Sequence, residues 1–260
     1  MRRPETLGAA LNGVERVLMI SRADGQLADT QRSFIDAAKA AGVRHIVKFS
    51  GLGAALDTPF RFNRMHAEIE QYLVESGLAW MCLRPSQFMQ TYFREAPTIA
   101  TEGVFYLPLE KARLAPVDVE DIAKAAFALL HGDGHEGKAY EMTGPEALTM
   151  DEVAERLSRA LGRTVRYVNV APKEKRRTLL AAGIPAAFAD AMDELFSERR
   201  KGSESTVNLS THETLGVRPT TFEDFARQNA AVFRGETAPA HLWSSAGRQT
   251  EPAAQSRALA

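Results

Sequence analysis

The stretch DTQRSFIDAAKAAGVRHIVKFSGLG, residues Asp29–Gly53, constrains the fold of this chain more than any other. Apolar residues recur at helical spacing between Phe34 and Ala41, which predicts an amphipathic helix with one buried face. Asp29 or Thr30 can cap the start of this helix, because a short side-chain oxygen accepts a hydrogen bond from the free N–H groups of the first turn. The stretch therefore predicts a helix that packs against an apolar partner.

A strand and a glycine-containing loop follow this helix. Gly42 can adopt the left-handed conformation that ends a helix, and His45–Phe49 is short, apolar and β-branched at its centre, as strands are. Ser50 then stands where the strand enters the loop of Gly51 and Gly53. In an open α/β sheet, ligands bind just outside the carboxyl ends of the strands. Ser50 is therefore a candidate functional residue.

Two further strands flank this unit. Val14–Ser21 has a nearly continuous apolar core, and Leu78–Leu83 is apolar throughout, which is typical of a strand covered on both faces. A second helix is predicted over Asn63–Ser76, and Arg84-Pro85 is expected to end the third strand. Three strands separated by two helices indicate right-handed βαβ units and a parallel sheet, so the predicted fold class is α/β.

The second half of the chain alternates less regularly. A strand is predicted at Val104–Leu107, and Asp118 can cap a helix over Val119–Leu130. Thr149 and Glu152 have the T-x-x-E spacing of a capping box at the start of another helix. The remaining predictions are strands at residues 138–142 and 165–170, and helices at 173–182, 185–201 and 222–233.

These elements suggest a division of the chain into three parts. Residues 1–131 hold the βαβ units and are expected to form the larger domain. Residues 132–234 are mostly helical and are expected to form a smaller domain over the carboxyl ends of the sheet, with residues 91–117 open to interleaving with it. Residues 235–260 are rich in Ala, Ser, Gln and Pro without a period, which predicts a disordered tail.

Composition argues against several classes of function. The formal net charge of the 260 residues is −1, so no global field attracts nucleic acid or an anionic membrane. No apolar run approaches the length that spans a bilayer, and the first residues lack the apolar core of a secretory signal. Cys82 is the single cysteine, which fits a cytoplasmic protein without internal disulfides. We expect a small molecule as the ligand, and leave open a homo-oligomer or a regulatory protein partner.

Four segments carry a family resemblance: residues 34–50 (FIDAAKAAGVRHIVKFS), 66–90 (HAEIEQYLVESGLAWMCLRPSQFMQ), 117–123 (VDVEDIA) and 140–163 (YEMTGPEALTMDEVAERLSRALGR). In this order and spacing they resemble the NmrA-like family of atypical short-chain dehydrogenases, which includes NAD(P)H:quinone reductases and cofactor-sensing regulators. The resemblance runs from about Leu7 to Phe233. It implies a Rossmann-type sheet with a smaller substrate domain, and NADP or NAD as the cofactor.

The resemblance also implies roles for single residues. Ser21 resembles the position that lies along the cofactor, and Ser50 falls at the end of the strand that carries the serine of the wider superfamily. Gly51, the next residue in the loop, is counted with them as cofactor-binding. Pro85 and Phe88 fall in the loop that resembles the wall on the nicotinamide side.

Residues 62–66 depart from the pattern of that superfamily. Phe62 stands where the superfamily has the tyrosine of its Tyr-x-x-x-Lys pair, and His66 stands where it has the lysine. A phenyl ring cannot donate a proton, so catalysis by a tyrosine acid is excluded at this position. His66 can still donate a hydrogen bond to a ribose hydroxyl or a substrate oxygen. His66 and Ser50 are therefore the candidates for catalysis, and both are also candidates for binding the cofactor.

The glycine-rich turn that holds the pyrophosphate in this family has no counterpart in the sequence. Gly51-Leu52-Gly53 follows a strand but precedes no helix, so it is not a substitute. Losing two or three hydrogen bonds to a charged group costs about 3–9 kcal/mol, which is roughly two to six orders of magnitude in affinity. We expect an N-terminally incomplete Rossmann sheet with Val14–Ser21 as its exposed edge, arising from a mis-called start, a truncated gene or a chain that pairs with another.

Two other patterns are open to a structural and a functional interpretation. The aromatic run from Phe88 to Phe93 can line a pocket for a flat ring, but its near-helical spacing favours plain core. His131 and His135 stand four residues apart, but glycines between them break the continuous helix that a zinc pair needs. No metal site is expected.

The sequence thus predicts an NAD(P)-dependent oxidoreductase that transfers a hydride to a small quinone- or carbonyl-like acceptor. Transfer to a quinone needs less proton assistance than carbonyl reduction, so the loss of the tyrosine leaves this activity open. The same loss favours a second hypothesis, a non-catalytic NAD(P)-sensing regulatory protein. A third is that the chain binds the cofactor weakly or not at all.

Overall fold

The computed structural model describes residues 3–239 and has a parallel four-stranded sheet at its centre. The strands lie in the order β1 (Arg16–Met19), β2 (His45–Phe49), β3 (Ala79–Pro85) and β5 (Lys138–Met142). Short, largely apolar runs form β2 and β3, because such residues fill both faces of a covered sheet, whereas the edge strand β5 has exposed residues at its start. The predicted α/β class with a Rossmann-type parallel sheet is confirmed.

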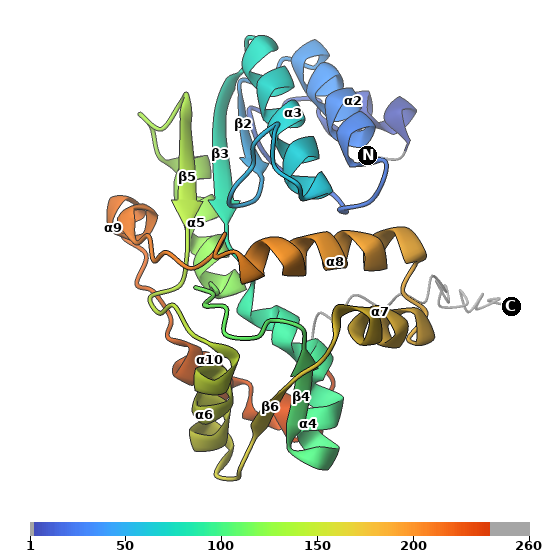
Figure 1. Cartoon of the computed structure of the whole chain (residues 1–260). Coiled ribbons are helices and arrows are strands. Elements are labelled where there is room, and N and C mark those ends of the chain that lie inside the picture. The colour runs from blue at the N-terminus through green and yellow to red at the C-terminus, as the bar shows by residue number, and fades with distance from the viewer. Residues whose placement is uncertain (1–2, 240–260) are drawn as a thin grey trace, which may run out of the picture.

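Helices cover both faces of this sheet (Figure 1). They are η1 (Pro4–Thr6), α1 (Leu7–Ala10), α2 (Leu27–Ala40), α3 (Arg61–Glu75) and α5 (Val119–His131). α2 and α3 pack on the face that carries Met19 and Ile46, and α5 packs on the face that carries Val47, Met81 and Met142. Because side chains alternate between the faces along a strand, β2 supplies apolar residues to both layers.

A second part of the molecule lies beyond the carboxyl ends of the strands (Figure 1). Its elements are η2 (Met89–Glu95), α4 (Ala96–Glu102), β4 (Val104–Leu107), α6 (Met150–Leu161), β6 (Arg166–Asn169), α7 (Pro172–Ala181), α10 (Phe222–Gln228) and α11 (Ala230–Phe233). β4 and β6 pair in parallel as a two-stranded sheet. Tyr92 packs edge-on against Phe105 and Phe222 in the core of this part. Most of the aromatic run from Phe88 to Phe93 is therefore core, as its spacing predicts.

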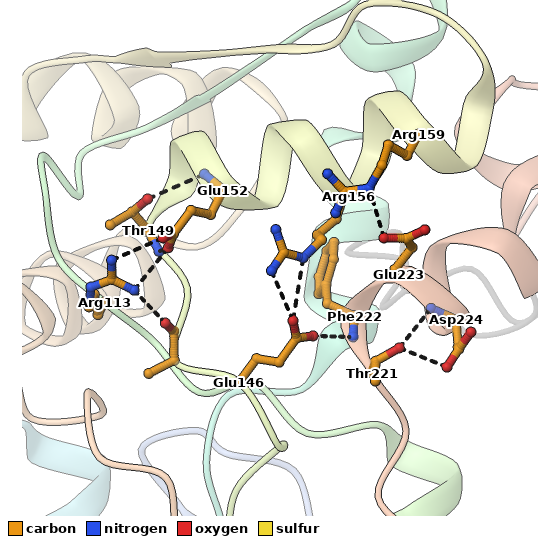
Figure 2. Close-up of polar contacts among 11 residues, drawn as sticks. Arg113, Glu146, Thr149, Glu152, Arg156, Arg159, Thr221, Phe222, Glu223 and Asp224 are labelled. Carbon is orange, nitrogen blue, oxygen red and sulfur yellow. Dashed lines mark hydrogen bonds and ion pairs between the residues drawn. The ribbon is translucent and has the colours of Figure 1, made fainter.

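The predicted capping box of α6 is confirmed. The Thr149 hydroxyl accepts from the Glu152 N–H, and the Glu152 carboxylate accepts from the Thr149 N–H (Figure 2). Arg113 donates to the same carboxylate and to a neighbouring carbonyl, so the loop after β4 is joined to the start of α6. Gly162 ends the helix with a φ of 67°.

Two carboxylates join α6 to α10. Glu146 accepts from Arg156 on α6 and from the N–H of Phe222 at the start of α10 (Figure 2). One turn further along, Arg159 on α6 pairs with Glu223 on α10 at 2.8 Å. These contacts set the angle between two helices that share an apolar core.

Helix α8 (Ala186–Arg200) crosses near the carboxyl ends of the central strands (Figure 1). Phe188 on α8 lies 6.2 Å, centroid to centroid, from Phe62 on α3. Glu194, further along α8, accepts from the Arg61 guanidinium and from the Arg61 backbone N–H. The short helix α9 (Ser210–Leu215) packs beside β5, where Thr211 donates to a backbone carbonyl. The carboxyl-terminal half of the chain thus borders the functional edge of the sheet.

The starts of two helices differ from prediction. α2 begins at Leu27 without a side-chain cap, so neither Asp29 nor Thr30 caps it. Asp29 lies in the first turn instead, where a carboxylate suits the positive end of the helix dipole. α3 begins at Arg61, also without a side-chain cap.

Three further segments differ from the prediction. β3 runs two residues past the predicted end at Leu83 and ends at Pro85, whose carbonyl accepts from the N–H of Leu52. β5 lies on the far side of the predicted boundary at residues 131 and 132, yet it pairs with β3 in the central sheet. The helix predicted over 222–233 is two helices, α10 and α11. Residues 240–260 of the predicted tail lie outside the described residues.

Candidate active site

The polar candidates gather at the carboxyl edge of β1, β2 and β3. Ser21 follows β1 by two residues, and its hydroxyl oxygen accepts from the side-chain amide of Gln31 on α2 at 2.9 Å. Ser50 follows β2 directly, is buried, and donates its N–H to the Leu83 carbonyl at 2.8 Å. Strand ends that lie side by side bring residues distant in the sequence to one edge.

Ser50, Glu70 and Arg84 form one hydrogen-bonded group. The Ser50 hydroxyl donates to Glu70 Oε1 at 2.5 Å. Arg84, from the adjacent strand, donates through two of its nitrogens to both oxygens of the same carboxylate. The Glu70 side chain is buried, and such a carboxylate is stable only when paired and hydrogen-bonded. The hydroxyl proton of Ser50 is therefore engaged with α3, and its oxygen remains able to accept. A catalytic role for Ser50 stays a prediction.

His66 lies on α3 above a buried lysine of β2. The Nζ of Lys48 lies 2.9 Å from His66 Nδ1, and Lys48 is fully buried. Burial lowers the pKa of Lys48 to about 8 against the raising effect of the Glu70 carboxylate. Burial, and then the charge of Lys48, lower the pKa of His66 well below its usual value. At neutral pH the pair is thus a cationic lysine and a neutral histidine.

The loop after β2 passes close to His66. A Cβ added at Gly51 would lie 3.3 Å from Asn63 Oδ1 and 3.7 Å from His66 Cδ2. Asn63 donates to the carbonyl of Leu52 at 2.9 Å, which holds the loop against the start of α3. A glycine at position 51 therefore leaves open the space beside the imidazole edge, as close approach of a ligand to a backbone requires.

Phe62 and His66 do not form a proton-donating pair. The Phe62 ring is buried and packs between Phe60 and Phe188. Its position is thus part of the apolar contact between α3 and α8. Lys48, which the sequence reasoning missed, places an ammonium against His66 from β2 instead. The signal was present: Lys48 is the single charged residue in the centre of an otherwise apolar strand.

Pro85 and Phe88 lie on different sides of the edge. The Pro85 carbonyl accepts from the N–H of Leu52 at 2.9 Å, so Pro85 adjoins the Gly51 loop. Phe88 packs edge-on against Phe49 at 5.9 Å, in the layer covered by α5. Within residues 3–239, no hydrogen bond or ring contact joins Phe88 to His66. The structure brings together Ser50, Gly51, His66 and Pro85, and their binding roles stay predictions.

Two buried amide oxygens in this region have no hydrogen-bond partner in the described part of the chain. They are Oε1 of Gln31, beside Ser21, and Oε1 of Gln87, two residues after β3. A buried acceptor without a donor costs free energy, so an N–H or O–H group of a ligand would satisfy either oxygen. The carboxamide and ribose hydroxyls of a nicotinamide nucleotide are groups of this kind. The residues present therefore fit the nicotinamide end of a dinucleotide.

Other candidate features lie away from this edge. A pocket of about 310 Å³ between β3, β5 and α9 is lined by Arg84, Glu141 and hydroxyl residues, but by none of the predicted site residues. His131 bonds to the Phe127 carbonyl and His135 to the Tyr140 hydroxyl. Among residues 3–239, no group of three or more His, Cys, Asp or Glu side chains could hold a metal ion. No helix in this range is long and apolar enough to span a bilayer.

Comparison with known proteins identifies the family to which the chain is similar. A family model described as the NmrA-like family matches residues 1–226. The NAD(P)H azoreductase of Xenophilus azovorans is 38% identical over 233 residues, which cover 90% of this chain and 82% of that protein.

Two solved reductases share the fold. The NADPH-dependent quinone oxidoreductase of Escherichia coli, in complex with NADPH, has a TM-score of 0.79 and 31% identity over 86% of this chain and 80% of that one. The triphenylmethane reductase of Citrobacter sp., in complex with NADP(H), has a TM-score of 0.78 and 25% identity over 87% of this chain and 81% of that one.

Proposed function

The chain belongs to the NmrA-like family, and on this basis we propose that it is an NAD(P)H-dependent reductase of a flat, conjugated, quinone-like acceptor. The names of the three similar proteins support the acceptor class, because azo, quinone and triphenylmethane compounds are all conjugated hydride acceptors. A planar acceptor that takes a hydride into a conjugated system demands less of an acid catalyst than an isolated carbonyl does. The absence of a tyrosine at position 62 is compatible with this chemistry.

The observation that carries the proposal is the polar group at the carboxyl ends of β2 and β3. Lys48, Ser50, Glu70 and Arg84 are buried or half-buried there, and His66 keeps part of its surface accessible. Burying this many ionisable groups is costly, and proteins place such groups at functional sites. The carboxyl edge of a parallel sheet is also where ligands of this fold class bind.

The residues of the edge divide between cofactor and acceptor. Ser21 and Gln31 border one side of the nicotinamide end, and Gly51 and Pro85 border the other. When bound, the reduced nicotinamide supplies the hydride. His66 donates a hydrogen bond from its Nε2 to the acceptor atom on which negative charge develops, because its Nδ1 faces Lys48.

We assign the acceptor side to the part of the chain formed by η2, α8 and the helices beyond them, which borders the same edge. This retains the proposed division into a larger domain and a smaller substrate domain, with β5 moved to the larger one. We also propose a cytoplasmic location, because the single cysteine, Cys82, is buried and unpaired.

The test begins with binding. Purified protein is titrated with NADPH and with NADH, a benzoquinone and an azo dye are then added separately, and the absorbance of the reduced nicotinamide is followed. We expect binding and turnover in the wild type, and a loss of about 10²-fold in turnover for His66→Gln. His131→Gln, on the exposed surface of α5, is the matched control and should behave as the wild type.

Two outcomes would contradict the proposal. Tight binding of NADPH without turnover of any acceptor would favour the regulatory, cofactor-sensing alternative. Turnover that survives His66→Gln unchanged would remove His66 from the site while leaving the reductase in place.

A further inference from the structure

Lys48 is the least expected charge in the molecule. It lies in the middle of an apolar strand, and its fully buried ammonium is 2.9 Å from His66 Nδ1 and 3.3 Å from the Phe49 carbonyl. The carboxylate on the same face, Glu70, is bonded to Arg84 and Ser50. A lysine at this position is destabilising for the fold, because its main partner is a neutral imidazole rather than an anion. The sheet would be more stable with an apolar residue there.

The contact fixes the proton of the imidazole. An ammonium has only donors, so Lys48 donates to His66 Nδ1, and neutral His66 carries its proton on Nε2. Within residues 3–239 the Nε2 atom makes no hydrogen bond, and His66 remains partly exposed. The ring carbon bonded to Nε2, Cδ2, is the atom that a Cβ at Gly51 would approach. The N–H of Nε2 therefore lies near the Gly51 loop, and the Lys48 ammonium holds a second proton at the Nδ1 side of the ring.

We infer that Lys48 supplies the proton of the reduction through His66, an inference that rests on the proposed reductase function. The acceptor first gains a hydride, and with it two electrons and a negative charge. The N–H bond at His66 Nε2 then breaks as an O–H or N–H bond forms on the acceptor. In the same step His66 Nδ1 takes a proton from Lys48 Nζ, which becomes a neutral amine. Uptake of one proton from water at Nε2, with return of the Nδ1 proton to Lys48, restores the starting state.

The surrounding charges suit this role. The charged or titratable groups that face Lys48 are Glu70 on α3 and Cys82 and Arg84 on β3, together with His66. Arg84 remains a cation, and burial raises the pKa of the Cys82 thiol to about 12, so neither takes the proton from Lys48 near neutral pH. With a pKa lowered to about 8, Lys48 is protonated at neutral pH and gives up its proton more readily than an ordinary lysine does. Lys48 thus occupies the position of a proton donor one ring away from the acceptor.

Two substitutions separate the relay from a structural hydrogen bond. Lys48→Gln keeps an N–H donor for His66 Nδ1 but has no transferable proton. Lys48→Met removes the donor and buries a thioether in place of the ammonium, so it is expected to fold at least as well and can replace the glutamine variant if that one unfolds. Lys138→Gln, an exposed lysine of β5, is the control for the loss of one positive charge.

The first measurement needs no cofactor. Nitrogen NMR of the histidine side chains, with His66 assigned through His66→Gln, reports which ring nitrogen carries the proton. We expect a neutral ring protonated at Nε2 in the wild type at neutral pH. In Lys48→Met the pKa of His66 should rise, because the neighbouring positive charge is gone. A proton on Nδ1 in the wild type would overturn the inference. So would a His66 pKa that is the same in Lys48→Met as in the wild type.

The second measurement is the pH profile of turnover with a benzoquinone. Wild-type turnover should fall as the pH rises through about 8, where Lys48 loses its proton. Lys48→Gln should lower turnover by about 10²-fold at neutral pH and remove this inflection, with the Kd for NADPH unchanged. Turnover in Lys48→Gln equal to that of the wild type would overturn the relay alone. An absence of turnover in the wild type would overturn the reductase, and the relay with it.

Discussion

The hydroxyl of Ser50 donates to the carboxylate of Glu70, with Oγ 2.5 Å from Oε1, and so joins the end of β2 to α3. Arg84 of β3 donates to the same carboxylate, which therefore ties two strands and a helix together at the functional edge. Hydrogen bonds to a buried charge are worth more than those between neutral groups, because the charge is otherwise poorly solvated. The edge is rigid where the ligand is proposed to bind.

Glu70→Gln tests this junction. The amide oxygen can still accept from Ser50, but the guanidinium of Arg84 loses this charged partner and, among residues 3–239, keeps Glu141 at 3.9 Å. Because Arg84 is a quarter exposed, we expect a loss of about 2–3 kcal/mol in the free energy of unfolding, below the cost of breaking a fully buried pair. Urea unfolding measures this loss. Glu15→Gln, in the exposed pair with Arg44, is the control and should cost less than about 1 kcal/mol. Equal losses in the two variants would contradict the prediction.

The buried lysine makes stability depend on pH. Burial lowers the pKa of Lys48 from 10.5 to about 8 in the folded protein. Below about pH 8 both the folded and the unfolded chain hold the proton, and the folded state bears the full cost of the buried charge. Between about pH 8 and 10.5 the unfolded chain binds the proton and the folded chain releases it, so stability rises with pH.

Lys48→Met should abolish this rise. Between about pH 8 and pH 9 we expect the wild type to gain about 1 kcal/mol relative to Lys48→Met, measured by urea unfolding at each pH. The Cys82 thiol, whose pKa burial raises to about 12, titrates differently in the folded and unfolded chains, but it does so in both proteins and largely cancels in the difference. A constant difference between the two proteins across this window would show that Lys48 does not titrate there.

The two glycines of the β2 loop should respond differently to alanine. Gly53 has a φ of +76°, so Gly53→Ala is strained and should cost about 1–2 kcal/mol of stability. Gly51 lies outside the left-handed region, so Gly51→Ala avoids this backbone strain and should cost less stability than Gly53→Ala. Its methyl group would instead project toward His66 and Asn63 and raise the Kd for NADPH by roughly tenfold, about 1.4 kcal/mol. Calorimetric titration and urea unfolding of both variants distinguish the two effects, and an unchanged Kd in Gly51→Ala would remove Gly51 from the binding site.

Phe62→Tyr should not create an acid catalyst. The ring is buried between Phe60 and Phe188, so an added hydroxyl would be buried beside aromatic rings and should cost about 1–3 kcal/mol of stability. Turnover of a quinone should not rise. Phe127→Tyr, at an exposed position of α5, is the control and should leave stability unchanged. A rise in turnover with Phe62→Tyr would show that this side chain reaches the reacting atoms.

Much of the fold could be predicted from the sequence because its signals are local. The β2 strand was predicted with its observed bounds, His45–Phe49, and the T-x-x-E box of α6 with its observed contacts. Each of these features depends on residues that are close in the sequence. The starts of α2 and α3 were missed because neither has a side-chain cap. β5 was assigned to the wrong part of the chain because its partner strand, β3, lies more than fifty residues earlier.

For the candidate site too, some features could be predicted from the sequence and others depend on the tertiary structure. The strand end was sufficient to place Ser50 at the edge, because a residue that follows a parallel strand lies at the carboxyl edge wherever the strand packs. Gly51 and His66 were identified through the family resemblance. Only the tertiary structure showed that the Ser50 hydroxyl donates a hydrogen bond to Glu70, and that the lysine beside His66 comes from β2 rather than from α3. These pairings depend on how α3 lies across the sheet, and the protonation of Lys48 and His66 depends on the solvation that this packing removes. Neither quantity is a property of a short stretch of sequence.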